Sequence, residues 1–124
     1  MAEERPKPGG YRDLLVWQKG IQLAREIYLL TRTFPAEERF ALTSQLRRAA
    51  TSVPSNIAEG QARRTTGGFI QLVGCAEGSL AEIDTQLVIA TEVGLANSKS
   101  VVPIDDRLQE LRRMLHALRR KLDA

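Results

Sequence analysis

The residues best suited to chemistry in this chain are one histidine, His116, and one cysteine, Cys75. A cysteine nucleophile needs an adjacent base, but these two lie far apart in sequence, each within a predicted amphipathic helix. Arg113, rather than a glutamate, stands three positions before His116, so the Glu-x-x-His pattern of di-iron bundles is missing. Zinc-ligand spacing is missing too, and Gly67-Gly68 lacks the lysine of a phosphate-binding loop. The sequence therefore predicts no enzyme, no catalytic residue, no metal and no cofactor.

Charge is the second chemical feature. The chain has 124 residues and a net charge of +3, which is weak evidence for a nucleic-acid partner. Residues 39–64 hold five arginines against one acid, whereas residues 65–94 hold four acids and no lysine or arginine. We interpret the carboxylates Glu77, Glu82 and Asp84 as partners of arginines on another helix, within a subunit or between subunits. The Arg63-Arg64 turn before a helix start is either an anion site or a solvated, capped turn.

Four helices must position these groups. Apolar residues at steps of three and four predict helices over about 12–32 and 36–62, a third that begins in the turn at residues 65–68 and ends before Gly94, and a fourth from about Val102 or Pro103, at its first position, to Leu122. The expected buried face of the first helix is Leu14, Trp17, Ile21, Ala24 and Tyr28, widened by Val16, Leu23, Ile27 and Leu30. The expected apolar stripe of the second helix is Leu42, Leu46, Ala49, Val53 and Ile57, and the expected seam of the fourth is Ile104, Leu108, Leu111, Leu115, Leu118 and Leu122. The first helix ends before Pro35, a threonine of the Thr65-Thr66-Gly67-Gly68 turn is a favourable N-cap for the third, and Gly94 suits its C-terminal end. Short connections between amphipathic helices predict an all-α, antiparallel up-down-up-down four-helix bundle.

The second predicted helix contains an interior proline, Pro54, which removes a backbone hydrogen bond. A stripe of small polar residues runs along it, and Gly74, Gly78 and Ala81 form a strip of small residues on the third helix. Small residues allow close approach of another helix, either within the chain or from another subunit. We assign a subunit interface to the following residues: Gln45, Arg48, Ser52, Asn56, Glu59, Gly74, Gly78 and Glu82.

The remaining segments bound the domain. Residues 1–11 are charged and rich in proline and glycine, which predicts a disordered tail before one domain over 12–124. The N-terminus lacks the apolar core of a signal peptide, so we expect a cytoplasmic protein. No apolar run approaches the ~20 residues that span a bilayer, so no membrane partner is expected.

Three sequence blocks carry a family resemblance: DLLVWQKGIQLAREIY, TRTFPAEERFALTSQLRRAATSVPSNIAEGQARR and GGFIQLVGCAEGSLAEIDTQL. With them the chain resembles the family of four-helix bundle proteins encoded in intervening sequences of 23S ribosomal RNA genes. The resemblance implies an antiparallel bundle that assembles as a homopentamer. It also implies similarity in fold to an accessory protein of diversity-generating retroelements, a pentamer thought to bind nucleic acid and a reverse transcriptase. The family motif covers Arg47, Arg48, Ser52, Pro54, Asn56, Glu59, Gly60, Glu77, Gly78, Ser79 and Glu82.

Two functions remain open. The first is a non-enzymatic, homopentameric accessory protein that binds RNA or DNA. Its phosphate contacts would come from Arg47, Arg48, Arg63, Arg64, Arg112, Arg113, Arg119, Arg120 and Lys121. The second is a protein-interaction scaffold without nucleic acid, in which the arginines pair with the acidic segment of a neighbouring subunit.

Overall fold

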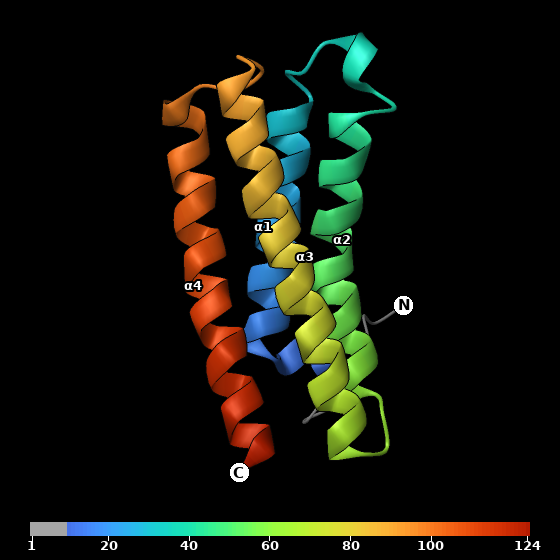
Figure 1. The fold of residues 1–124 in the computed structure, drawn as a ribbon. Coiled ribbons are helices and arrows are strands. Elements are labelled where there is room, and N and C mark those ends of the chain that lie inside the picture. The colour runs from blue at the N-terminus through green and yellow to red at the C-terminus, as the bar shows by residue number, and fades with distance from the viewer. Residues whose placement is uncertain (1–9) are drawn as a thin grey trace, which may run out of the picture.

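The fold consists of four long helices. A computed structural model describes residues 10–124, with α-helices α1 (Leu15–Thr31), α2 (Leu42–Gln61), α3 (Thr66–Glu92) and α4 (Ser98–Asp123). Two short 3-10 helices, Tyr11–Asp13 and Ala36–Glu38, precede α1 and α2. The prediction of an all-helical chain with four main helices is confirmed. In Figure 1 the helices stand side by side, α1 and α3 run towards one end, and α2 and α4 run towards the other.

The core lies between the four helices, each of which contacts two others: α1 with α2 and α4, and α3 with α2 and α4. Burying a leucine or isoleucine side chain contributes about 1.5–3 kcal/mol, so a core fed by every helix stabilises the whole arrangement. The largest fully buried side chains are Leu23, Ile27, Leu46, Val53, Ile57, Val73, Leu80, Ile83, Leu108, Leu111 and Leu115. The predicted α4 seam and the predicted apolar stripe of α2 are therefore confirmed in their central parts.

The buried face of α1 differs from the predicted one at two positions. Ile21 and Tyr28 belong to the predicted face, but both are exposed. The prediction that Val16, Leu23, Ile27 and Leu30 widen the buried face is confirmed, and Gly20 is buried among them. Because α1 has apolar residues around much of its circumference, periodicity alone could not select the side that packs.

Two helices begin later than predicted. α1 begins at Leu15 instead of residue 12, because Leu14 has an extended backbone. α2 begins at Leu42 instead of residue 36, because Ala41 has φ −118° and ψ −114°, outside the helical region. The Glu38 carboxylate accepts a hydrogen bond from the Leu42 N–H at 3.4 Å, which supplies an acceptor at the new helix start.

α4 begins earlier than predicted, at Ser98. The Asn97 side chain accepts a hydrogen bond from the Ser100 N–H at 2.9 Å, as an N-cap does. Pro103 thus lies in the second turn of α4 and not at its first residue, and it is exposed.

Both predicted ends of α3 are confirmed. Thr65 Oγ1 accepts a hydrogen bond from the Gly68 N–H at 3.0 Å. At the other end, Gly94 has φ +79°, and the N–H groups of Leu95 and Gly94 donate to the carbonyls of Ala90 and Thr91. These two bonds form a Schellman motif, which satisfies carbonyls left free where the helix stops.

Pro54 is buried inside α2 and faces α1. A Cβ atom placed on Gly20 of α1 would lie 3.3 Å from Pro54 Cβ, closer than most real contacts. A residue without a side chain therefore allows α1 to approach the proline ring closely.

Of the predicted disordered tail, residues 1–9 lie outside the described residues. Its last residue, Tyr11, is instead placed in a 3-10 helix with its ring 5.5 Å from that of Trp17.

Candidate functional site

The strip of small residues on α3 lies on the outer surface of the chain. Gly74, Gly78 and Ala81 are exposed, and a Cβ atom added at either glycine would meet nothing within 4 Å. Close helix packing within the chain, one of the two interpretations of this strip, is therefore wrong. The other interpretation, contact with another subunit, remains a prediction.

A shallow groove of about 390 Å³ runs beside this strip, between α2 and α3. It is lined by Gln45, Gly78, Ala81, Glu82, Thr85, Gln86 and Ile89. Gln86 Oε1 is buried and has no hydrogen-bond partner among residues 10–124. Three of the predicted interface residues line this groove, and the other five lie on the same two helices, exposed or half-buried. Ser52 additionally hydrogen-bonds Ser79, which ties α2 to α3.

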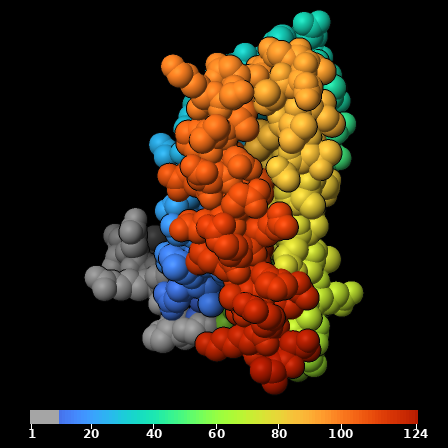
Figure 2. All heavy atoms as spheres, turned by 60° about the vertical axis from the view of Figure 1, so that its left-hand side comes forward, coloured from blue at the N-terminus to red at the C-terminus, as the bar shows by residue number. Residues whose placement is uncertain are grey.

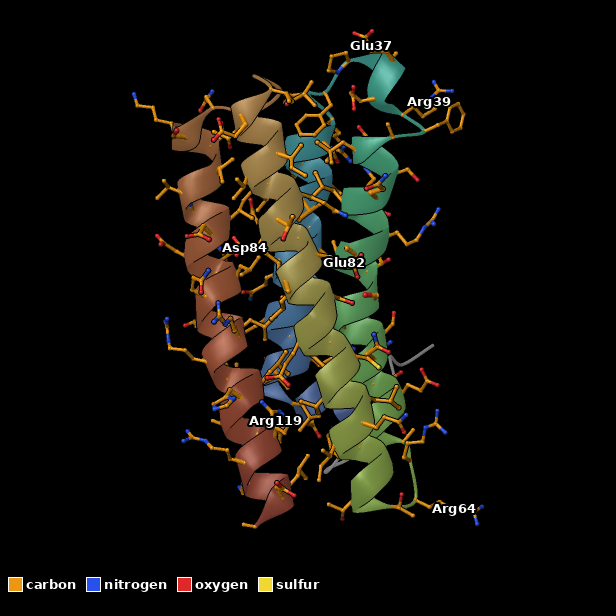
Figure 3. The ribbon with its side chains drawn as sticks, viewed as in Figure 1. Glu37, Arg39, Arg64, Glu82, Asp84 and Arg119 are labelled. Carbon is orange, nitrogen blue, oxygen red and sulfur yellow. The ribbon has the colours of Figure 1, made fainter. Side chains whose placement is uncertain are left out.

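The acidic residues of α3 have different partners from one another. Glu77 forms a forked ion pair with Arg119 of α4, with Oε1 to Nε at 2.8 Å and Oε2 to Nη2 at 3.3 Å. For Glu77 the predicted pairing with an arginine on another helix is confirmed. Glu82 and Asp84 make no ion pair in the described part of the chain, so the prediction is wrong for them within one subunit. In Figure 3, Glu82 lies on the α2 side of α3 and Asp84 on the α4 side.

The nine predicted phosphate-binding residues fall into two groups. Arg47 and Arg48 lie in the first turns of α2, whereas the other seven lie in the α2–α3 connection and the second half of α4. Figure 3 shows Arg64 and Arg119 at one end of the bundle and Arg39 at the opposite end. The structure therefore does not gather all nine on one surface.

Several of these cations already have partners within the chain. Arg63 pairs with Glu59 at 3.0 Å, Arg119 pairs with Glu77, and Arg112 donates to Gln109 at 3.4 Å. The side chains of five others make no ion pair or hydrogen bond within residues 10–124, and all are exposed or half-buried at the surface: Arg48, Arg64, Arg113, Arg120 and Lys121.

A pocket of about 370 Å³ lies at the end of the bundle where α2 begins. It is lined by Tyr28, Arg39, Phe40, Thr43, Ser44, Arg47, Arg48 and Thr51. Sequence reasoning found Arg47 and Arg48 but missed Arg39, Phe40 and Tyr28. The sequence signal that could have identified Phe40 is an aromatic residue next to an arginine, Arg39, a few positions after Pro35. Phe40 is exposed because α2 begins only at Leu42.

The residues considered for catalysis lie on different helices. Cys75 is exposed on α3, and His116 lies on α4 with its Nδ1 atom 3.0 Å from Arg119 Nη2. Across the described residues, no group of three or more histidine, cysteine or acidic side chains is arranged to hold a metal ion. Within the same range, no helix has the length and apolar character needed to cross a membrane.

Four long helices with exposed basic residues at both ends define an all-helical protein with cationic surfaces. The chain belongs to the family described as 23S rRNA-intervening sequence protein, whose model matches residues 12–117. A crystal structure of a protein of unknown function from the S23 ribosomal protein family of Bacteroides thetaiotaomicron has a similar fold. Its TM-score is 0.76 at 20% identity, covering 84% of this chain and 97% of that chain. No curated protein matches the sequence.

Proposed function

We propose that this protein is a cytoplasmic, non-enzymatic accessory protein that binds RNA or DNA as a homopentamer of antiparallel four-helix bundles. The observation that carries the nucleic-acid part is the set of five surface cations that lack partners within residues 10–124. An arginine without a nearby carboxylate keeps its full charge available to phosphate oxygens.

The charge distribution along α4 supports the same proposal. Its second half, residues 111–123, holds five basic residues and one acid, whereas residues 98–110 hold two basic residues and three acids. Figure 2 shows α4 covering one face of the molecule from end to end, with this basic half towards the C-terminus. Positive charge is therefore concentrated towards one end of an exposed helix, which favours attraction of a polyanion.

The α2–α3 face supports self-assembly. Ala81 and Ile89 of α3 are exposed apolar side chains in the groove, and the small-residue strip continues from them along the helix. A buried amide oxygen without a donor, as at Gln86, costs about 1–3 kcal/mol. A neighbouring subunit seated on this face would cover the apolar side chains and could supply the donor. The number of five subunits comes from the family resemblance.

A protein-interaction scaffold without nucleic acid is the alternative, and Glu82 and Asp84 favour it. Both carboxylates lack an ion-pair partner within the described chain and would suit arginines of another subunit or of another protein. Arg48, on the outer side of α2, is the arginine that the sequence assigns to both functions.

The test is RNA binding measured by fluorescence anisotropy over a range of salt concentrations. Replacing Arg113, Arg120 and Lys121 together with glutamine should weaken binding and flatten the log–log salt dependence by about 0.7 for each phosphate that is no longer neutralised. Arg107→Gln is the matched control, because Arg107 lies on α4 but donates to Gln22 of α1.

Absence of RNA binding by the native protein at low salt would refute the nucleic-acid proposal. Sedimentation velocity measures whether the Arg48→Glu variant still assembles. Loss of its assembly, together with no RNA binding by the native protein, would favour the scaffold.

A further inference from the structure

Arg47 is a half-buried arginine without a carboxylate partner. Its Nε atom donates to Thr31 Oγ1 at 2.8 Å, and its guanidinium carbon lies 4.7 Å from the centroid of the Tyr28 ring. No carboxylate among residues 10–124 lies within 4 Å of it, and its terminal amino groups make no hydrogen bond in that range. The guanidinium is therefore held in one orientation by α1 while two of its nitrogens remain available.

The pocket around Arg47 is built for an anion. Its lining combines three guanidinium groups, two aromatic rings and four hydroxyl groups, one of them the phenol of Tyr28, and it contains no carboxylate. The hydroxyls of Thr43 and Ser44 make no hydrogen bond within the described chain. Phosphate oxygens suit such a lining, because arginines present several N–H donors in a planar fork and hydroxyls add further donors.

Two carboxylates lie close in sequence to the pocket, and neither lines it. Glu38 accepts the Leu42 N–H, which directs it to the backbone. Figure 3 shows Glu37 at the outer end of its turn, pointing away from Arg39. Their charges reduce the net potential of this end of the molecule but leave the pocket wall itself cationic.

Phe40 forms the outer wall of the pocket and is 88% exposed, the highest exposure among the large apolar side chains of the described residues. The Arg39 guanidinium carbon lies 5.8 Å from its ring centroid. An exposed aromatic ring beside arginines resembles the stacking platforms of proteins that bind single-stranded nucleic acid. A base in a duplex is stacked between its neighbours and could not reach this ring.

We propose that this pocket binds one nucleotide unit of a single-stranded nucleic acid, with the base stacked on Phe40 and the phosphate held by Arg47 and Arg48. The proposal rests on the proposed nucleic-acid function and adds to it a specific site and a preference for single strands.

The experiment uses fluorescein-labelled oligoadenylate of about 10 nucleotides, alone and annealed to its complement, with the full-length protein. Phe40→Ala should weaken single-strand binding about 5- to 150-fold, with the salt dependence unchanged, because the ring contributes stacking and no charge. Phe40→Trp should retain binding. Val102→Ala is the control, since Val102 is also an exposed apolar side chain, at 55%, but lies on α4.

Charge variants test the phosphate contacts separately. Arg48→Gln should weaken binding and lower the salt slope by about 0.7, the contribution of one phosphate contact on a single strand. Arg47→Lys should weaken binding with the slope unchanged, because lysine keeps the charge but lacks the fork that Thr31 and Tyr28 orient. Circular dichroism of each variant checks that the helices persist.

Four results would overturn the proposal. A Phe40→Ala variant that binds RNA as tightly as the native protein would refute the pocket while leaving the proposed function intact. Equal affinity for the duplex would do the same. A Phe40→Ala variant that binds RNA normally but sediments as a smaller species would assign the ring to a subunit contact. Native protein that binds no RNA at low salt would overturn the site and the function together.

Discussion

Replacing Gly78 by alanine separates the folding of one subunit from its assembly. Gly78 lies in the middle of α3 on the outer surface, and a Cβ atom there would meet nothing within 4 Å. Glycine in an exposed helix interior costs about 1 kcal/mol relative to alanine, so the dissociated subunit should become more stable by that amount. The shift in Tm is this free energy divided by the entropy of unfolding, which grows with chain length. For a chain of 124 residues, the Tm of the subunit should rise by about 4 °C.

The same methyl group should weaken assembly if the α2–α3 groove is the subunit contact. It would occupy space on the groove floor, and overpacking a fitted interface costs about 1–3 kcal/mol. The subunit dissociation constant should then rise about 5- to 150-fold. Sedimentation velocity over a dilution series measures assembly. Urea unfolding at protein concentrations low enough for the subunits to separate measures the subunit alone, which matters because association shifts apparent stability.

Gly60→Ala is the matched control. A Cβ atom at Gly60 would lie 2.9 Å from Phe69 Cδ1 and 3.1 Å from Leu72 Cβ, so this alanine should destabilise the subunit by about 1–3 kcal/mol. A Gly78→Ala variant that is stabilised but assembles normally would refute the assignment of the strip to a subunit contact. A destabilised dissociated subunit would refute the argument from helix propensity.

Two further predictions concern contacts within the subunit. Glu77→Gln should lower the free energy of unfolding by about 0.5–1 kcal/mol, and less at high salt, because the fork to Arg119 is partly exposed at 22% and 39%. Urea midpoints at two salt concentrations check this, with Glu82→Gln, which has no ion-pair partner within residues 10–124, as the control that should change little. Gly94→Ala should cost about 1–2 kcal/mol because of its φ of +79°, measured by thermal unfolding. Gly67→Ala, where φ is not positive and a Cβ atom would meet nothing, should cost less.

Much of the fold was predictable because local patterns determine it. The 3-and-4 spacing from Ile104 to Leu115 predicted the buried seam of α4, and all four seam residues there are buried. Thr65 and Gly94 marked both ends of α3 because capping depends on side chains and backbone freedom within one turn. These features need no knowledge of which helices meet.

The candidate site was less predictable because it depends on packing between helices. Arg47 obtains its orientation from Thr31 and Tyr28 of α1, and no spacing rule connects residues on two helices. The exposure of Phe40 depends on the break at Ala41, which an apparently continuous helical pattern conceals. Carboxylates on α3 could be assigned to arginines by charge, but only the packed structure selects Arg119 for Glu77.

The contact between Pro54 and Gly20 predicts which property of the protein each substitution along α2 should change. One side of this helix is fixed by the distance to α1, and the opposite side bears the polar stripe, which is exposed at Gln45, Arg48 and Glu59 and joined to α3 at Ser52. A systematic scan of α2 should therefore produce two classes of defect that alternate with the helical repeat of about 3.6 residues. Changes facing α1 would lower the melting temperature, and changes half a turn away would alter association or binding in a folded protein. A scan in which both defects fell at the same positions would mean that the two faces are not independent.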